Sequence, residues 1–358
     1  MHSDRWQRNR FNGRIVMQLL EIKGVTGNSK ILIGETLENL AKYLPAGKSV
    51  IITDRNVSRI YRKSFPACDV IEIGTGEKIK NLDTVRDIYE KLVRLEADRS
   101  VFIVGIGGGI VCDIAGFVAS TYMRGVKFGF VPSTLLAQVD ASVGGKNGVN
   151  FRGYKNMIGT FNQPEFVVCD MTLLKTLPER DVLCGFGEIA KHAFIGDLRM
   201  CRYIEENIDL ALGLDEAVIS RLVYDSIVIK SSVVNRDEKE KGERRKLNFG
   251  HTFGHAIEKT TAELLHGEAI SVGMVVASKL SEKKGLISTE DARRIEKLLS
   301  SLGLPTALDV DRERMIDAIK RDKKRAGETI DFVLLHGIGS AILQQIGIPE
   351  LEEVVYGL

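Results

Sequence analysis

The chain has 358 residues, of which 44% are hydrophobic and 27% charged, a composition typical of a folded globular protein. This length exceeds what one hydrophobic core usually organises and predicts two domains. The 50 basic and 48 acidic residues leave a net charge of +2, which argues against a general nucleic-acid binder. Any anionic partner must therefore meet a local cluster of cations.

The cysteines and the N-terminal residues narrow the class further. The five cysteines are Cys68, Cys112, Cys169, Cys184 and Cys201. Their odd number, wide spacing and lack of a CxxC pair predict reduced thiols and a cytoplasmic protein. No apolar run approaches the roughly 18 to 20 residues that span a bilayer, so no membrane partner is expected. The first residues, MHSDRWQRNRFNGRIV, lack the apolar stretch of a secretory signal, and we expect residues 1–16 to be a disordered leader, with a mistaken start as the alternative.

Two kinds of sequence pattern follow one another along the rest of the chain. Up to Asp170, helical patterns alternate with the β-branched runs SVIITD, VIEIG, SVFIVGIGGG, VKFGFVPST and EFVVCD, which indicate buried parallel strands in βαβ units. Later stretches such as LDEAVISRLVYDSIVIKSSVV and TEDARRIEKLLSSLG carry charges opposite an apolar stripe. We therefore predict an α/β, Rossmann-like nucleotide-binding domain over residues 17–178 and a mostly α-helical domain over residues 179–358.

The first chemical signal is the glycine-rich turn in FIVGIGGGIVCDIAG, residues 102–116. Glycines before a helix let backbone N–H groups approach a pyrophosphate closely. The turn is not a GxGxxG motif with an acidic residue about 20 positions later, so a turn needed only for strand–helix packing is the alternative. Upstream strand ends add Asp54, which suits a ribose hydroxyl, and Glu77 with Lys80.

A second polar segment, VPSTLLAQVDASVGGKNGVNFRGYKNMIGTF, spans residues 131–161. It supplies Asp140, Lys146, Lys155 and Asn156. A lysine in a glycine loop is a point charge suited to phosphate or carboxylate. A flexible surface loop is the alternative, but the paired glycines and alternating apolar residues indicate an ordered segment.

Two of the six histidines, His251 and His255 in LNFGHTFGHAIE, lie four residues apart. On a helix they would share a face, so both could bind one metal, or one could bind it while the other acts on a substrate. A catalytic zinc-type site needs about three protein ligands and an open position. The further candidates are His266, Glu188 and, less favoured, Glu268. Two structural histidines, and a simple Glu188–Lys191 pair on one helix, are the alternatives; the metalloprotease pattern HExxH is absent.

Taken together, ten motifs between about Met17 and Leu358 resemble the sugar phosphate cyclases and, within them, the 3-dehydroquinate synthase family. They are TDRN, GEKIK, GGGIVCDIAGFVASTYMRG, PSTLLAQVDASVGGKNGVN, YKNMIGTF, LKTLPER, GEIAKHA, DEKEKGERRKLNFGHTFGHAIE, LHGEA and RDKKR. No single motif is decisive, whereas ten in the family's order are specific. Asn147, Gly187 and Ala190 depart from the usual family residues, which concerns packing beside the matched positions.

The resemblance implies a carbon-oxygen lyase of the shikimate pathway to aromatic amino acids. Such an enzyme converts 3-deoxy-D-arabino-heptulosonate 7-phosphate to 3-dehydroquinate and phosphate by transient NAD oxidation, phosphate elimination, re-reduction and intramolecular aldol closure. The implied cofactors are NAD and a divalent metal, zinc or cobalt, and the implied assembly is a homodimer. The helical domain would then bind the metal and substrate.

The resemblance also assigns roles to residues of this chain. The implied metal ligands are Glu188, His251 and His266, and the implied catalytic residues are His255, Glu240, Lys146 and Asn156. The implied NAD-binding residues are Asp54, Asn56, Glu77, Lys80, Gly108, Gly109, Ile110, Asp113, Ser133, Thr134 and Lys155. The implied substrate-binding residues are Arg124, Asp140, Lys146, Asn156, Lys191, Lys230, Arg244, Asn248 and Lys324, the last favoured over Lys323. Glu240 and Arg244 lie in the charge run RDEKEKGERRK, which composition alone assigns to a solvated loop.

Other functions compete with this interpretation. Another sugar phosphate cyclase would use the same framework with an altered DASVGGK segment. A metal-dependent polyol dehydrogenase would release NADH, and the phosphate-binding lysines and arginines argue against it. A non-catalytic NAD-binding regulator would not need the metal set of Glu188, His251 and His266.

Overall fold

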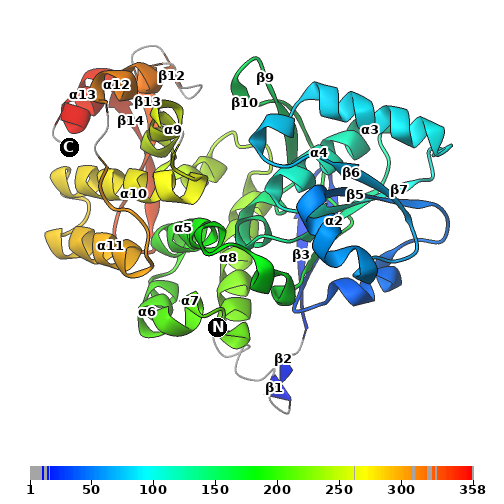
Figure 1. Ribbon diagram of the computed structural model, residues 1–358. Helices are drawn as coiled ribbons and strands as arrows, with labels where there is room; N and C mark the ends of the chain where they lie inside the picture. The colour runs from blue at the N-terminus through cyan, green and yellow to red at the C-terminus, as the bar shows by residue number, and fades with distance from the viewer. Residues whose placement is uncertain are drawn as a thin grey trace. The chain divides into compact units, whose positions relative to one another are not determined.

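The computed structural model describes residues 10–11, 14–15, 17–261, 263–308, 311–320, 325–326 and 329–356. The chain forms two compact units, and Figure 1 labels their elements. The first unit contains Met1–Leu177 and Ile219–Glu238, and the second contains Pro178–Val218 and Lys239–Leu358. In the predicted leader, Arg10–Phe11 and Arg14–Ile15 pair as the short antiparallel strands β1 and β2.

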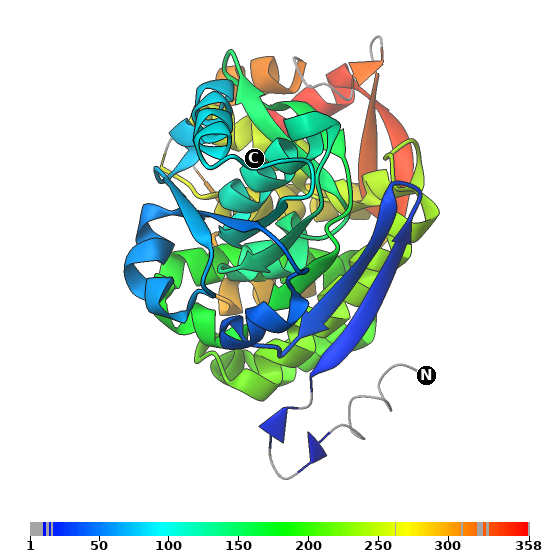
Figure 2. The same cartoon turned by 90° about the vertical axis from the view of Figure 1, so that its right-hand side faces the viewer.

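The first unit is built on a seven-stranded sheet with the order β3-β4-β11-β8-β7-β5-β6. Its strands are β3 (Gln18–Gly24), β4 (Gly27–Ile33), β5 (Ser49–Asp54), β6 (Asp69–Ile73), β7 (Phe102–Gly107), β8 (Phe128–Pro132) and β11 (Phe166–Cys169). All pairs are parallel except β3 with β4, the long edge hairpin in Figure 2. Every residue of β7 and β8 is buried, as expected for strands covered on both faces. The predicted α/β fold is confirmed, although the β3–β4 hairpin was not predicted.

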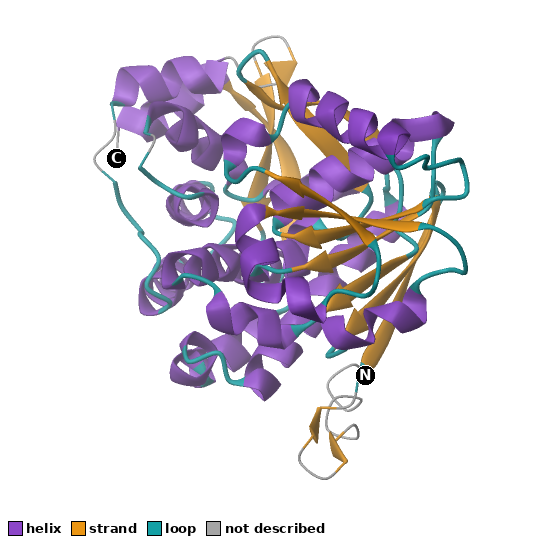
Figure 3. Ribbon diagram, turned by 45° about the vertical axis from the view of Figure 1, so that its right-hand side comes forward, coloured by secondary structure: helices purple, strands orange, loops and turns teal. Residues whose placement is uncertain are grey.

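Helices and short helical turns connect these strands, and Figure 3 shows helices packed against the sheet. They are η1 (Leu37–Tyr43), α2 (Arg55–Tyr61), η2 (Arg62–Ser64), η3 (Glu77–Ile79), α3 (Leu82–Arg94), α4 (Gly109–Thr121), η4 (Tyr122–Arg124), the π-helical turn η5 (Ala137–Ala141) and η6 (Met171–Thr176). A separate hairpin, β9 (Lys146–Phe151) with β10 (Tyr154–Phe161), packs on α4. The sheet therefore holds α4, and α4 in turn supports the lysine-bearing hairpin.

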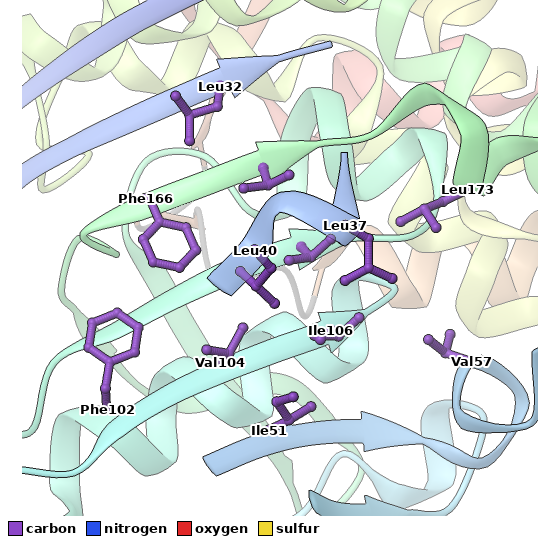
Figure 4. Packing of buried hydrophobic residues seen from close by; sticks show 12 residues of the cluster. Leu32, Leu37, Leu40, Ile51, Val57, Phe102, Val104, Ile106, Phe166 and Leu173 are labelled. Carbon is purple, nitrogen blue, oxygen red and sulfur yellow. The ribbon is translucent and has the colours of Figure 1, made fainter. Parts of the chain in front are cut away.

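Apolar side chains fill the space between the sheet and η1 (Figure 4). Leu37 and Leu40 of η1 are almost fully buried against the strands. The rings of Phe102 and Phe166, on β7 and β11, stack with their centroids 5.7 Å apart. Full burial of side chains of this size stabilises a fold by roughly 1.5 to 3 kcal/mol each. This core fixes the strands whose carboxyl ends carry the polar residues described below.

Helix α8 (Glu216–Arg236) belongs to both units, because its residues from Ile219 onward cluster with the first. Lys230 donates to the Asp140 carbonyl oxygen at 2.6 Å, and the Lys23 N–H donates to Asn235 Oδ1 at 3.3 Å. The sequence predicted one continuous domain over 179–358, from which this grouping differs. An amphipathic pattern shows that a helix buries one face, but not which part of the chain covers that face.

The second unit is mostly helical, as predicted. Its helices are α5 (Glu179–Gly196), α6 (Leu198–Glu206), α7 (Ile208–Leu212), the 3-10 helix η7 (Glu243–Asn248), α9 (His251–Thr260), α10 (His266–Lys283), α11 (Thr289–Ser301), α12 (Arg312–Lys320) and α13 (Ile348–Tyr356). It also contains an antiparallel sheet that was not predicted, β12 (Arg325–Ala326), β13 (Thr329–Leu335) and β14 (Ala341–Gly347). Within the described parts of the chain, no helix is long and apolar enough to cross a membrane.

A buried carboxylate, that of Glu238, secures the last residue of the first unit. It accepts hydrogen bonds from Val25 N at 2.7 Å, from the N–H and hydroxyl of Thr26, and from Gln163 Nε2 at 2.9 Å. A Cβ on Gly24 would lie 2.4 Å from Glu238 Oε1, so glycine is needed beside it. Burial opposes ionisation, but these donors hold the pKa of Glu238 below its ordinary value.

We expect Glu238→Gln to lower the free energy of unfolding by roughly 2 kcal/mol at pH 7, because an amide NH2 would face several donors. Since the folded-state pKa lies below the unfolded value, the contribution of Glu238 is complete above that value and is lost as the pH falls through the folded pKa. Urea denaturation of parent and variant from pH 7 to pH 3 measures this difference. Glu90→Gln, on the exposed face of α3, is the control; a difference independent of pH would contradict the assignment.

Candidate active site

Three side chains of the second unit meet at a candidate metal centre. Glu188 comes from α5, and His251 and His266 are the first residues of α9 and α10. Glu188 is fully buried, and its Oε1 lies 3.6 Å from His251 Nε2 and 3.4 Å from His266 Nε2. Ligand atoms of the three residues lie within 4.8 Å of one another. Within the described part of the chain, Glu188 Oε1 has no hydrogen-bond partner.

The second nitrogen of each imidazole has its own acceptor. His251 Nδ1 lies 3.1 Å from the Phe249 carbonyl oxygen, and His266 Nδ1 lies 3.3 Å from Glu258 Oε1. Because these oxygens only accept, each Nδ1 is assigned the hydrogen, and in the neutral rings each Nε2 carries a lone pair. Both lone pairs belong to the nitrogens nearest Glu188. One carboxylate and two imidazoles are the donor set of a catalytic zinc-type site with an open fourth position, so these residues fit such a metal.

Neighbouring groups keep the buried carboxylate of Glu188 ionised. Burial opposes ionisation of Glu188, but the ammonium of Lys191, which donates to Oε2, and the two imidazoles hold its pKa well below the ordinary value. Burial, with Lys191 adding to it, holds the pKa of His251 well below its ordinary value. Burial also disfavours charge on His266, yet the carboxylates of Glu188 and Glu258 raise its pKa to about 9. Glu188 therefore presents a negative charge to its neighbours.

The two remaining metal candidates lie differently. His255 is on the same helix as His251, their ring centroids are 5.2 Å apart, and its ring is 6.1 Å from that of His266. It borders the centre without belonging to the Glu188 set. Glu268, the less favoured ligand candidate, instead binds Arg180 through both oxygens at 2.6 and 2.7 Å and caps α10 at the Leu265 N–H.

Glycines bring the three helices to this close approach. A Cβ on Gly267, next to His266, would lie 2.2 Å from the Cys184 carbonyl oxygen of α5. A Cβ on Gly187, next to Glu188, would lie 2.8 Å from the Gly267 oxygen. Gly250, next to His251, has φ +76, and a Cβ on Gly273 would meet its oxygen at 2.1 Å. Each candidate ligand therefore follows or precedes a glycine at which two helix backbones touch. The departure from the family pattern at Gly187 has its physical reason here.

The charged segment before α9 is more buried than its composition suggests. Glu240 has a left-handed backbone, φ +56, and its Oε1 accepts from Asn248 Nδ2 at 2.8 Å. Arg244 in η7 is only 2% exposed. The solvated-loop interpretation is wrong for Arg244 and for Glu238, because charge density along a sequence does not reveal which charges are paired inside the protein.

In the first unit, the predicted NAD residues follow the carboxyl ends of adjacent parallel strands. Strand β5 pairs with β7, and β7 with β8. Asp54, Gly107 and Ser133 therefore lie at one edge of the sheet, and the Ser133 N–H donates to the Gly107 carbonyl at 2.9 Å. Asp54 Oδ1 also accepts from the Asn56 N–H at 2.8 Å, which caps α2. This edge is where open α/β sheets bind ligands.

The glycine turn forms the N-terminus of α4. Gly108 is the N-cap, Gly109 the first helical residue and Ile110 the second, and no side chain of the described residues caps the helix. A Cβ on Gly108 would lie 3.1 Å from Thr134, and one on Gly109 3.0 Å from Ala141. Backbone N–H groups at such a helix start suit a pyrophosphate. These residues fit the predicted dinucleotide.

Beside this turn, a polar network joins four of the predicted residues through one that was missed. Lys80 donates to Asp113 and, at 2.6 Å, to Asn156 Oδ1. Asn150 donates to Glu77 Oε1 at 2.6 Å and accepts from the N–H of Asn156 at 2.9 Å. Asn156 has φ +51, a conformation that these bonds hold in place. Asn150 ends the quoted motif DASVGGKNGVN, so its position in that motif was the available signal.

Other predicted substrate residues of this unit are spread around the network. Asp140 pairs with the buried Lys230 of α8. Burial raises the pKa of Asp113, the carboxylates of Glu77 and Asp140 add to this shift, and Lys80 opposes it. The predicted lysines Lys146 and Lys155 are exposed on β9 and β10.

One predicted substrate-binding residue, Arg124, is not brought to these clusters. Arg124 is exposed at the end of η4, which follows the C-terminal end of the 13-residue helix α4. The glycine turn is at the N-terminal end of this helix, about 20 Å away along its axis. Lys324 lies outside the described residues, as does its alternative Lys323.

Comparison with known proteins agrees with this geometry. Residues 70–184 match the family model "3-dehydroquinate synthase N-terminal", and residues 185–325 match "3-dehydroquinate synthase C-terminal". The 3-dehydroquinate synthase of Acetivibrio thermocellus is 45% identical over 298 residues, 80% of this chain and 83% of that protein. That of Campylobacter concisus is 41% identical over 334 residues, 91% and 94% of the two chains.

Solved structures of two related cyclases are also similar to this chain over most of its length. A 2-deoxy-scyllo-inosose synthase, complexed with carbaglucose-6-phosphate, NAD+ and Co2+, has a TM-score of 0.82 at 27% identity and covers 94% of this chain and 99% of its own. ValA, the 2-epi-5-epi-valiolone synthase of Streptomyces hygroscopicus, with NAD+ and Zn2+ bound, has a TM-score of 0.85 at 25% identity and covers 95% and 98%. Fold and site thus define a sugar phosphate cyclase. The chain belongs to the 3-dehydroquinate synthase family.

The glycine contacts generate a prediction about Gly267→Ala. The new methyl group would push α5 from α10, so we expect roughly 1 to 3 kcal/mol lower stability and Zn2+ binding weaker by about 10-fold or more. Urea denaturation and competition with a chromophoric chelator measure the two effects. Gly285→Ala is the matched control beyond the end of α10, where φ is +71 and no atom lies within 4 Å of the added Cβ. That variant should lose stability through backbone strain alone; equal loss of Zn2+ affinity in both would refute the explanation.

Proposed function

We propose that this protein converts 3-deoxy-D-arabino-heptulosonate 7-phosphate to 3-dehydroquinate and inorganic phosphate, with NAD recycled within each turnover. The observation that carries the proposal is the Glu188, His251 and His266 cluster, with His255 one helical turn from a ligand, in a chain of this family. The reaction joins a transient oxidation, phosphate elimination, re-reduction and an intramolecular aldol closure. It belongs to the shikimate pathway.

Glu188, His251 and His266 would hold a divalent metal, Zn2+ or Co2+, and the sheet edge of the first unit would hold NAD. When bound, the metal supplies Lewis acidity toward a substrate oxygen and NAD supplies a reversible hydride acceptor. In support, two related cyclases bind NAD+ with Co2+ or Zn2+. The proposed NAD-binding residues are Asp54, Asn56, Glu77, Lys80, Gly108, Gly109, Ile110, Asp113, Ser133, Thr134 and Lys155.

The chain's own side chains bind, orient and move protons. His255 carries a proton at an imidazole nitrogen, a role suited to a ring whose two nitrogens can donate and accept. Glu240, held by Asn248, has an acid–base role as well. Lys146 and Asn156 are the other proposed catalytic residues, and Lys80 positions Asn156 through its amide oxygen. Fixed donors of this kind stabilise charge that develops on a leaving phosphate.

Buried cations support an anionic substrate in a chain whose net charge is only +2. The proposed substrate-binding residues are Arg124, Asp140, Lys146, Asn156, Lys191, Lys230, Arg244, Asn248 and Lys324. Three of the cations, Lys191, Lys230 and Arg244, are at most 5% exposed, which is rare unless a charge is paired or functional.

The proposal extends to a domain organisation, a compartment and an assembly. We propose a nucleotide domain over 17–178, a metal and substrate domain over 179–358, a reducing, cytoplasmic location and a homodimer. All five cysteines are free thiols and four are buried, which supports a reducing compartment. Light scattering on the purified protein measures the assembly directly.

Turnover stoichiometry tests the function. Purified protein with Zn2+, the heptulosonate phosphate and NAD well below the substrate concentration should release many phosphates per NAD, without net gain in absorbance at the NADH wavelength. Phosphate release and NADH absorbance are followed together. One NADH per substrate, or no phosphate, would contradict the proposal; the former result would indicate a dehydrogenase.

Replacement of one ligand tests the metal centre. His266→Ala should abolish stoichiometric Zn2+ binding and lower turnover by more than the about 10- to 100-fold typical of outer-shell changes. The NAD dissociation constant should change little, because the proposed NAD-binding residues are in the other unit. His336→Ala, which alters an exposed histidine between β13 and β14, is the control. Unchanged activity in His266→Ala would exclude His266 as a ligand.

A further inference from the structure

We propose that Glu258 is a positioning residue of the metal centre, whose carboxylate orients His266 so that Nε2 is available to the cation. This inference rests on the proposed metal site. Glu258 lies on α9, seven residues after His251 and three after His255, so all three share one face of the helix. Its side chain is 8% exposed, and Oε1 lies 3.3 Å from His266 Nδ1.

This contact fixes which nitrogen of His266 faces the site. A carboxylate only accepts, so Nδ1 donates its hydrogen to Glu258 and the neutral ring keeps its lone pair on Nε2. That nitrogen is the one 3.4 Å from Glu188 Oε1. Without the carboxylate, the hydrogen can move to Nε2 and block ligation, and the ring can rotate.

His251 meets the same requirement in a different way. Its Nδ1 lies 3.1 Å from the Phe249 carbonyl oxygen, a backbone group that no substitution removes. His266 relies on a side chain instead. Carboxylates behind ligating histidines fix the tautomer and raise the basicity of the coordinating nitrogen.

The position of Glu258 is costly for the fold, which argues against a merely structural role. It lies in the last turn of α9, which ends at Thr260, where the helix dipole disfavours a negative charge. Its carboxylate is also almost completely buried. Glu258 in addition lies beside the proposed proton carrier, because ligand atoms of His255, Glu258 and His266 are within 4.8 Å of one another. One carboxylate therefore borders both a metal ligand and an acid–base group.

The test is the Zn2+ affinity of Glu258→Gln. The full-length protein is freed of metal with a chelator and titrated with Zn2+ against a chromophoric competitor. We expect the dissociation constant to rise about 10- to 100-fold, as for other outer-shell partners of ligating histidines. The visible absorption of the Co2+-loaded variant should also change, because it reports ligand geometry. The unfolding temperature of the metal-free variant should not fall.

Two further variants make the result decisive. Glu258→Asp keeps the charge on a shorter side chain, so its Zn2+ dissociation constant should lie between those of the parent and Glu258→Gln. Glu282→Gln removes a charge from α10 four turns beyond His266, and it should bind Zn2+ as the parent does. Parent-like affinity and Co2+ spectrum in Glu258→Gln would overturn the inference while leaving the metal site intact. Failure of the parent itself to bind Zn2+ would overturn both.

Discussion

A fully buried carboxylate at the contact of three helices is the constraint on which the second unit depends. Removing an ion from water costs several kcal/mol, so Glu188 needs a cation and polar partners at close range. Lys191 reaches it from the next turn of α5, and the two imidazoles reach it from the first residues of α9 and α10. That geometry requires backbones to touch, which only glycine permits at Gly187 and Gly267. The glycines that let these helices pack closely are therefore the same residues that bring the partners of Glu188 within reach.

The first unit solves a different problem, which is to assemble polar groups that are distant in sequence. Parallel pairing places the carboxyl ends of β5, β7 and β8 at one edge of the sheet. Asp54 and Ser133 therefore both lie at this edge, although they are far apart in the sequence. The hairpin β9–β10 then packs on α4 and is tied to η3 through Asn150. The apolar sheet thus determines where the polar side chains at this edge lie.

The sequence predicted the parallel strands well, because β-branched runs are a local pattern, and the helical spacing of His251 and His255 predicted that they share one face. Glu188 and His266 were candidates by residue type and family resemblance, and the structure places them beside His251. Features that depend on distant partners left no such pattern. Glu258, Asn150 and Glu238 are ordinary polar residues whose meaning lies in a neighbour from another element. Likewise, nothing local distinguishes the buried Arg244 from the exposed charges around it. The grouping of Ile219–Glu238 with the first unit is also a tertiary property.

This discontinuous grouping has a consequence for how the chain folds during synthesis. The first unit takes its final segment from residues up to Glu238, so it cannot complete its contacts when residue 177 leaves the ribosome. Residues 178–218, which belong to the other unit, are made in between. Domains usually fold as units from the N-terminus onward. Here the nascent first unit must wait, with the site for Lys230 beside Asp140 still open, until more than half the protein has been translated.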